Sequence, residues 1–475
     1  MKVAVIGAGP AGMTAAYELA KQIPGVDVYE AGSSVGGLAK SIQLWNQTVD
    51  IGPHRFFSSD RRVNEAWLEV VGKDYEMVDR LTRIYYKKTF FHYPLKPFDA
   101  LKNLGLWEAT RCMTSFFAEK IVPTKQTNTF ETWVKSRFGK RLYEIFFKAY
   151  TEKLWGIKCS ELDADFAAQR IKKLSLWEAV KNGVMGGKGN KHKTLVDQFA
   201  YPHGGTGMVY ERMAAFVTKQ GGNVFLNTPV ERVITENGKV KAIQTTTGEI
   251  REYDHIVSSM PMTLLVSRLP DVPTDILERN KKLKFRNTIL VYLKVEAKNL
   301  FPDNWIYVHS TDMLSGRITN FRNWVPELYG KEESTIIALE YWCYDEDEIW
   351  TRPHEQLIEL AKKELESTGL VPKNKITAGH VYLIPRCYPV YDNGYKDNLK
   401  PVENFLSSVQ NLHVIGRYGA FKYNNQDHSI LMGLLASENI LKNARHNLWD
   451  INTDYDNYQE ESVITKTGLE RKASA

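Results

Sequence analysis

Three glycines and one glutamate near the start of the 475-residue chain have the types and spacing that hold a dinucleotide. Gly7, Gly9 and Gly12 follow a short apolar run at residues 3–6, and Glu30 closes a second short run. In such a motif the glycines allow a tight turn, a close approach of the backbone to a pyrophosphate, and close packing of helix on strand. The pyrophosphate lies at the positive end of the helix. A carboxylate at the position of Glu30 accepts from a ribose hydroxyl, which predicts an unphosphorylated adenosine.

A second glycine pair follows soon after the acid. Gly36 and Gly37 stand where proteins that bind FAD, and not simple NAD dehydrogenases, bring the backbone close to the cofactor. Without a Cβ, glycine permits that approach. We therefore predict FAD as the cofactor, with Val230, at the start of a strand expected over 230–235, as a further contact.

The composition is that of an ordinary globular chain. Hydrophobic residues make up 43% and charged residues 25%, and no run approaches the roughly 18 apolar residues of a membrane helix. The net charge of +6 fits an anionic ligand and does not require a nucleic acid. The four cysteines lie far apart with no CxxC pair, which argues against a metal site and a disulfide framework. We expect a cytoplasmic protein without a bound metal.

The elements that must position these residues predict a discontinuous α/β fold. Strands alternate with helices at both ends of the chain, which is typical of a Rossmann-type domain. The predicted FAD-binding domain therefore comprises residues 1–58, 200–262 and 408–446.

Two further units and a tail account for the rest of the chain. Residues 59–199 show mostly helical periodicity and predict an inserted helical domain. This range includes a glycine-rich basic loop at 181–193, which is either a lid over an anionic ligand or a solvated loop. Residues 263–407 predict a second, mostly antiparallel β-sheet domain that holds the substrate, and the polar tail at 447–475 is expected to be disordered.

Three longer motifs resemble those of the UDP-galactopyranose mutases and their relatives among the amine-oxidase-like flavoproteins. The first is Gly-Pro-His-Arg-Phe at 52–56. The second runs from Leu-Tyr at 142–143 through Tyr-Thr-Glu-Lys-Leu-Trp-Gly at 150–156 to Ser-Glu-Leu-Asp at 160–163. The third is Gly-Arg-Tyr-Gly-Ala-Phe-Lys-Tyr-Asn-Asn-Gln-Asp-His-Ser at 416–429. The likeness extends over nearly the whole chain to about residue 444.

The resemblance implies an unusual reaction. In this family reduced FAD acts as the nucleophile toward the anomeric carbon of a nucleotide-diphosphate sugar, and pyranose and furanose forms interconvert without net redox change. Arginines would hold the leaving diphosphate, and tyrosine hydroxyls would add donors. NAD(P)H is the candidate external reductant.

The resemblance also assigns roles to individual residues. Catalytic roles fall to Arg170, Arg317, Tyr423 and His54, and the substrate pocket adds Trp155. Arg170 and Arg317 match the two diphosphate arginines, and Tyr423 matches a phosphate-binding tyrosine. The motif places three further side chains against the flavin: Arg417, Asn425 and Gln426.

One departure from the family leaves alternatives open. Leu-Ser-Leu-Trp-Glu at 174–178 and the basic loop stand where the family has an aromatic, acidic segment that binds uridine. The sugar and its nucleotide are therefore not determined. An FAD oxidoreductase of the amine oxidase or protoporphyrinogen oxidase type remains the main alternative, and a catalytically silent FAD-binding module is a third. The sequence does not predict the oligomeric state.

Overall fold

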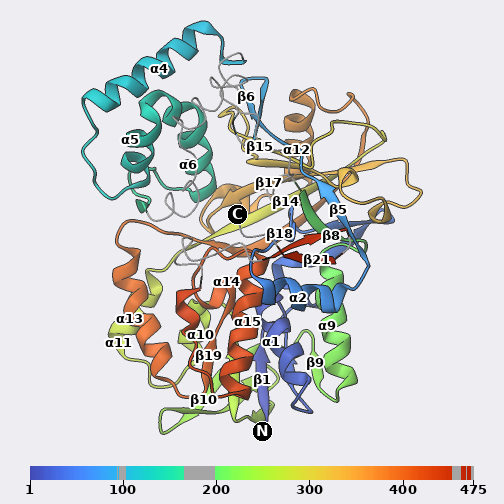
Figure 1. Cartoon of the computed structure of the whole chain (residues 1–475), viewed down its shortest axis with the longest axis vertical. Coiled ribbons are helices and arrows are strands. Elements are labelled where there is room, and N and C mark those ends of the chain that lie inside the picture. Colours follow the sequence, from blue (N-terminus) through green and yellow to red (C-terminus); the bar gives the residue numbers. More distant parts are fainter. Residues whose placement is uncertain (94, 96–102, 165–197, 452–461, 467, 472–475) are drawn as a thin grey trace.

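The computed structural model of the chain describes residues 1–93, 95, 103–164, 198–451, 462–466 and 468–471. Arg170, the basic loop at 181–193 and the segment 174–178 lie outside the described residues. The described part has a mixed α/β architecture with a parallel sheet at one end and a large mixed sheet at the other (Figure 1). The predicted fold class is confirmed.

A five-stranded parallel sheet carries the start of the chain. Its strands, in spatial order, are β19 (Leu412–Val414), β13 (His255–Ser258), β1 (Val3–Ile6), β2 (Asp27–Tyr29) and β9 (Asn223–Phe225). β1 is buried along its whole length, as its apolar run predicts for a parallel strand covered on both faces. Segments from both ends of the sequence therefore meet in one sheet, as the repeated return of strand patterns indicated.

Helices cover this parallel sheet. They are α1 (Pro10–Ala20), α2 (Arg61–Val71), α9 (Gly207–Lys219), α14 (Gly416–Gly419) and α15 (Gln426–Leu441). α1 packs against α15 and α9 and begins with a proline, whose fixed φ suits the first helical position. Beside the sheet lies a three-stranded antiparallel unit of β10 (Val230–Glu236), β11 (Lys239–Thr245) and β12 (Ile250–Glu252).

A seven-stranded sheet forms the roof of the molecule. Its order is β18 (Ile376–Pro389), β14 (Phe285–Val295), β17 (Thr335–Cys343), β16 (Arg317–Asn320), β15 (Trp305–Val308), β6 (Thr82–Tyr86) and β7 (Thr89–His92). All neighbours pair antiparallel except β15 and β6, which pair in parallel. α12 (His354–Ser367) packs against β14 and β18. The predominance of antiparallel pairs agrees with the sequence pattern over 286–386.

The chain between residues 59 and 164 differs from the expected mostly helical pattern. The helices α4 (Leu106–Ile121), α5 (Phe130–Leu142) and α6 (Ala149–Trp155) are present, and the π-helical turn η2 (Tyr143–Lys148) joins the last two. β6 and β7, however, extend the roof sheet, and β5 (Tyr75–Asp79) pairs with β8 (Gln198–Pro202). In Figure 1, α4, α5 and α6 lie together to one side of both sheets, with α4 at the outer edge.

The described parts of the tail are also ordered, in contrast to the expected disorder. A 3-10 turn, η6 (Leu448–Asp450), is followed by a hairpin of β20 (Ser462–Thr465) and β21 (Gly468–Arg471) that packs on α2. The Tyr75 hydroxyl donates to the carbonyl of Thr465 at 2.7 Å. This pairing between distant segments has no local signal in the sequence.

Three remaining helices, α10 (Met262–Arg268), α11 (Thr274–Lys281) and α13 (Tyr395–Ser408), pack beside the parallel sheet, and a hairpin of β3 (Ser41–Leu44) and β4 (Gln47–Asp50) lies next to the cavity described below. None of the described helices is long and apolar enough to cross a membrane.

A buried carboxylate joins the parts around this hairpin. Asp50, at the end of β4, accepts from Ser41 Oγ at 2.6 Å, from the Tyr201 hydroxyl at 2.7 Å and from the Thr206 N–H at 3.2 Å. Burial raises the pKa of Asp50 to about 6, although its donors oppose the shift. Thr206 in turn donates through Oγ1 to the carbonyl of His54 at 2.8 Å. The segment that carries His54 is thereby fixed to the start of α9.

Candidate active site

A cavity of about 670 Å³ runs between the parallel sheet and the roof sheet. This volume lies in the range of ligand and cofactor pockets. Its walls come from the turn after β1, the segments that follow β2 and β4, the strands β15, β16 and β18, and the loop between α14 and α15. Most residues that the sequence singled out line this space, namely Gly7, Gly9, Glu30, Gly37, His54, Val230, Arg317, Arg417, Tyr423, Asn425 and Gln426.

The glycines at one end form a backbone cradle that a side chain would fill. A Cβ on Gly37 would lie 2.8 Å from the Cα of Gly9, and a Cβ on Gly12 would lie 1.9 Å from the carbonyl oxygen of Gly7. Gly7 has a φ of 93° and Gly36 a φ of 101°, which are values that favour glycine. Gly12 and Gly36 do not line the cavity themselves. Their role in this geometry is to let α1 pack closely and to turn the chain toward Gly37.

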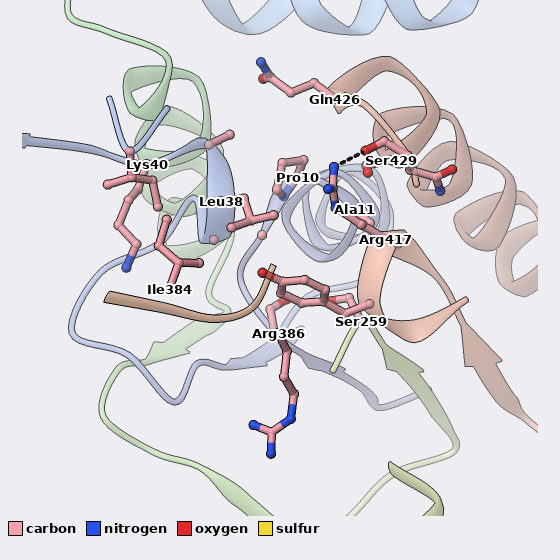
Figure 2. A pocket seen from close by; sticks show the side chains of 18 of the residues that line it. Pro10, Ala11, Leu38, Lys40, Ser259, Ile384, Arg386, Arg417, Gln426 and Ser429 are labelled. Carbon is pink, nitrogen blue, oxygen red and sulfur yellow. Dashed lines mark hydrogen bonds between the residues drawn. The ribbon is translucent and has the colours of Figure 1, made fainter. Parts of the chain in front are cut away.

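Glu30 lies beside this cradle and is already held by the backbone. One carboxylate oxygen accepts from the N–H of Ala8 at 2.8 Å and the other accepts from the N–H of Gly32 at 2.7 Å. A carboxylate has about four acceptor positions, so two remain for ribose hydroxyls. The start of α1 supplies the free N–H groups that a diphosphate requires. Figure 2 shows Pro10 and Ala11 at this helix start, with Leu38 and Lys40 on one side and Arg417 and Ser429 on the other.

The middle of the cavity is lined by arginines and tyrosines. Arg317, at the start of β16, is only 14% exposed and lies 3.3 Å from the carboxylate of Glu340, which is 3% exposed. Burial lowers the pKa of Arg317, but Glu340 and neighbouring tyrosines raise it more, so the pKa lies well above its usual value. Arg317 also approaches the Tyr388 hydroxyl at 3.5 Å. A permanently charged arginine therefore lines the cavity with its counter-ion behind it.

Arg417 connects this layer to the loop after α14. Its guanidinium donates to the carbonyl of Cys387 at 2.9 Å and to that of Asn424 at 3.0 Å. It also lies 4.4 Å from the ring centre of Tyr423, and the rings of Tyr423 and Tyr388 stack at 5.4 Å. These contacts fix Tyr423 within the arginine layer.

His54 lies close to the two arginines and is uncharged. Burial, followed by the charges of Arg317 and Arg417, lowers its pKa to about 4. Its Nε2 lies 3.3 Å from the carbonyl of Ile51. Because a carbonyl only accepts, Nε2 is the nitrogen that carries the proton in this hydrogen bond. A neutral imidazole here can offer or accept a hydrogen bond but does not add a positive charge at neutral pH.

Asn425 and Gln426 form the start of α15. The Asn425 side chain caps the helix together with His428. The amide of Gln426 accepts from the Tyr210 hydroxyl at 2.8 Å. Both side chains are thus positioned at the cavity edge by local and long-range contacts.

Trp155 is placed differently from the prediction. Its side chain is fully buried and does not line the cavity. Its ring lies 5.8 Å from that of Tyr423 and 6.1 Å from that of Tyr388. Trp155 therefore supports the tyrosine layer from behind, as a core residue would.

The sequence interpretation missed several residues of the site. Tyr150, Trp305, Tyr307 and Arg55 line the cavity, and Glu340 holds Arg317. Tyr150 stands in a run of aromatic residues at helical spacing, and such spacing does not distinguish a core residue from a cavity wall. The signal available in the sequence was the alternation along β15, which places Trp305 and Tyr307 on the same face of the strand.

A comparison with family models decides the broader class. The model described as flavin containing amine oxidoreductase matches residues 10–441. The chain belongs to this family. FAD is accordingly its cofactor, and this flavoprotein is an enzyme of the FAD-dependent amine oxidase superfamily. The glycine cradle and the two acceptor positions left on Glu30 fit that cofactor.

Individual relatives of the flavoprotein have two kinds of activity in their names. A Klebsiella pneumoniae protein named "Probable UDP-galactopyranose mutase" is 29% identical over 177 residues, which are 34% of this chain and 43% of the relative. The coproporphyrinogen III oxidase of Staphylococcus aureus is 22% identical over 286 residues, which are 54% of this chain and 60% of the relative. The aligned part thus spans less than two thirds of either relative.

The fold of the flavoprotein is similar to that of a solved mutase. The crystal structure of a reduced UDP-galactopyranose mutase superposes with a TM-score of 0.82 and 22% identity, over 96% of this chain and 99% of that one. At this identity the likeness concerns the fold.

Proposed function

We propose that this flavoprotein interconverts the pyranose and furanose forms of a nucleotide-diphosphate sugar. The observation that carries the proposal is the buried Arg317, which shares one cavity with the glycine cradle and with Tyr423 and Arg417. A buried cation facing a cavity that already has an FAD site suits a second anionic ligand beside the cofactor. Reduced FAD, when bound, supplies the nucleophile for the anomeric carbon of the sugar.

The arginine layer accounts for binding of the leaving group. Arg317 faces the cavity with Glu340 at 3.3 Å on its other side, so its position is fixed before a ligand arrives. Tyr423 adds a hydroxyl donor. Together they hold a diphosphate in place while its bond to the sugar breaks and forms again. Arg170, outside the described residues, is proposed as the second arginine on this diphosphate.

The aromatic wall accounts for the exclusion of water. Tyr150, Trp305 and Tyr307 line the cavity next to Arg317. The rings of Tyr150 and Tyr307 meet at 5.5 Å in an edge-to-face contact. Apolar ring faces there keep water away from an activated sugar, which hydrolysis would otherwise consume. His54 is proposed to orient a polar group of the ligand or cofactor as a neutral imidazole.

An oxidoreductase of the amine oxidase or protoporphyrinogen oxidase type is the second candidate. The match to the amine oxidoreductase family and the coproporphyrinogen III oxidase relative favour it. The buried positive charge of Arg317 argues for an anionic ligand rather than an amine substrate, which is mostly a cation at neutral pH.

Counting substrate turnovers against flavin reduction separates the two functions. The protein is reduced once under anaerobic conditions and then mixed with a large excess of nucleotide-diphosphate sugar. A mutase converts many substrate molecules for each reduced flavin, and its flavin remains reduced. An oxidoreductase that oxidises its substrate would be idle with reduced flavin and without oxygen. Started instead with oxidised flavin, it would reduce one flavin for each substrate molecule oxidised, and that stoichiometry would rule out the mutase. The assay is run with UDP-galactopyranose first and then with other nucleotide sugars, which keeps the choice of sugar separate from the choice of reaction.

A further inference from the structure

Arg55 lies in the wall of the cavity without a counter-ion. It directly follows His54 in the chain and lines the same space. None of the described residues accepts a hydrogen bond from its guanidinium or forms an ion pair with it. The nearby Arg83 differs, because its Nε and Nη2 donate to the carboxylate of Asp303 at 2.8 and 2.6 Å. The donors of Arg55 are therefore open to a ligand in the cavity.

Aromatic rings hold the guanidinium of Arg55 without using its donors. Its central carbon lies 4.6 Å from the ring centre of Phe57 and 5.9 Å from that of Trp305. All three residues line the cavity. A guanidinium that contacts aromatic faces keeps its N–H groups at the edge of its plane, where a carboxylate or a phosphate can accept two of them. These contacts orient Arg55 before a ligand arrives.

The surroundings of Arg55 have an excess of positive charge. Burial lowers the pKa of Arg55; Tyr307 opposes this shift, and the charge of Arg80 adds to it. The Nε of Arg80 is itself buried and has no hydrogen-bond partner among the described residues. Asp427 acts on Arg55 through its charge, but the two do not form an ion pair. A bound anion would compensate this charge, and its absence is costly for a partly buried cation.

Arg55 and Arg317 face different parts of the same cavity wall. The guanidinium of Arg317 lies 5.9 Å from the ring centre of Tyr307, whereas that of Arg55 lies 5.9 Å from the ring centre of Trp305. These two rings follow each other on one face of β15, with their centres 6.4 Å apart. A ligand with one anionic group at Arg317 can therefore reach Arg55 with a second one.

We propose that Arg55 binds a second oxyanion of the substrate, in addition to the group held by Arg317. This inference rests on the proposed function, which supplies a nucleotide-diphosphate sugar as the ligand. A phosphate of the diphosphate and a carboxylate on the sugar share the required chemistry, because each accepts two parallel N–H groups. The diphosphate of FAD is a poorer occupant: its donors are at the start of α1, whereas Arg55 stands against β15 of the roof sheet.

Calorimetric titration of the FAD-loaded protein with UDP, UDP-galactose and UDP-galacturonate tests this proposal and identifies the oxyanion. If Arg55 binds a phosphate, the variant Arg55→Met should weaken all three ligands by about tenfold or more. If Arg55 binds a carboxylate on the sugar, the wild type should prefer UDP-galacturonate to UDP-galactose by about tenfold, and Arg55→Met should lose only that preference. Arg55→Lys keeps the charge but not the two parallel donors, and should weaken the same ligands by a smaller factor.

A matched control removes the same charge elsewhere. Arg137 lies 3.7 Å from the ring centre of Trp133, outside the cavity, and Arg137→Met should leave all three affinities unchanged. The flavin spectrum and the thermal midpoint of each variant show whether it is folded and loaded with FAD.

Three outcomes would overturn the proposal. Unchanged affinities in Arg55→Met and Arg55→Lys would show that Arg55 does not bind the substrate, while the proposed function would stand. Loss of FAD from folded Arg55→Met would place Arg55 at the cofactor instead. Failure of UDP and both sugars to bind the wild type would overturn this inference together with the assignment of a nucleotide-diphosphate ligand.

Discussion

Arg317 and Glu340 show how one buried charge can be kept in a cavity wall. The two groups lie 3.3 Å apart and both are nearly inaccessible. Burial raises the pKa of Glu340, while the charge of Arg317 lowers it. Removal of one partner from such a pair leaves the other in a poorly solvated place, which costs about 3–5 kcal/mol when the group stays charged. Burial of the two charges therefore costs free energy of folding, and a role of Arg317 in ligand binding explains why the pair is kept.

We predict that Arg317→Ala keeps FAD bound but lowers turnover by about a hundredfold or more, because the cation that holds the diphosphate is lost. Glu30→Ala should have the reverse effect and weaken FAD about tenfold through the loss of ribose acceptors. FAD affinity is measured by flavin fluorescence, and turnover is measured on enzyme saturated with FAD. Arg352→Ala, which removes a surface arginine paired with Glu348, is the control. Loss of flavin from Arg317→Ala would mean that Arg317 belongs to the cofactor site.

At the scale of elements, close approach of two backbones creates the cofactor cradle. Gly9 at the start of α1 meets Gly37 in the 3-10 turn η1 (Gly37–Ala39), and the space between them is too small for a methyl group. The turn is held by a hydrogen bond from the N–H of Gly36 to the carbonyl of Ala8 at 2.8 Å.

We predict that Gly37→Ala weakens FAD binding by roughly tenfold or more, because the Cβ of the new alanine would push the turn away from α1. Gly221→Ala is a suitable control: Gly221 also has a positive φ of 82°, but no atom lies within 4 Å of its Cβ position. Both variants should lose about 1 kcal/mol of stability through backbone strain. Equal FAD affinities in the two variants would contradict the cradle.

Hydrogen bonds and a ring contact link α6 to the segment that precedes Arg317. Lys153 of α6 donates to the carbonyls of Val308, Ser310 and Ser315 at 3.1, 3.0 and 2.9 Å. The ring of His309 stacks on Tyr150 at 4.7 Å. Burial and the charge of Lys153 lower the pKa of His309 to about 3, so this imidazole is neutral in the folded protein.

The lowered pKa of His309 predicts that the folded protein loses stability in acid. Below its ordinary pKa near 6.5 the unfolded His309 binds a proton, whereas the folded one does not until about pH 3. The free energy of unfolding therefore falls as the pH decreases between these values. The variant His309→Phe keeps the ring stack but has no imidazole to protonate. Between neutral pH and pH 4.5 its free energy of unfolding should therefore fall by on the order of 2 kcal/mol less than that of the wild type. Urea unfolding at several pH values measures the difference.

The contribution of Asp50 has the opposite sign, since its raised pKa makes the folded protein gain its proton first. It is present in both proteins and cancels in the comparison. Parallel stability curves for the wild type and His309→Phe would show that His309 does not titrate as described.

At the scale of the whole molecule, the sequence predicted the parts that local patterns encode. The fingerprint from Gly7 to Glu30 and the motif around Arg417 and Tyr423 fall on one cavity, and Arg317 reaches the same cavity from the roof sheet. The assignments of Arg317, Arg417 and Tyr423 follow from the resemblance to the mutase family, whereas the spacing from Gly7 to Glu30 is fixed by a turn and a helix start. Such spacing can be recognised without knowledge of the tertiary contacts.

Contacts between distant segments could not be predicted in the same way. β6 lies in the range expected to be helical, yet it pairs with β15, which is more than two hundred residues later in the chain. Trp155 and Tyr150 stand in the same aromatic run, but only Tyr150 lines the cavity. Their separation depends on how α6 packs against the roof sheet, and the spacing of apolar residues does not determine that packing.

The most direct test of the proposed function is sugar interconversion by the purified protein before and after reduction with dithionite. UDP-galactopyranose and UDP-galactofuranose are the first substrate pair, and other nucleotide-diphosphate sugars follow in the same assay. We predict interconversion only after reduction, with the flavin still reduced at the end. A reduced, FAD-loaded protein that interconverts none of these sugars would contradict the proposed mutase function.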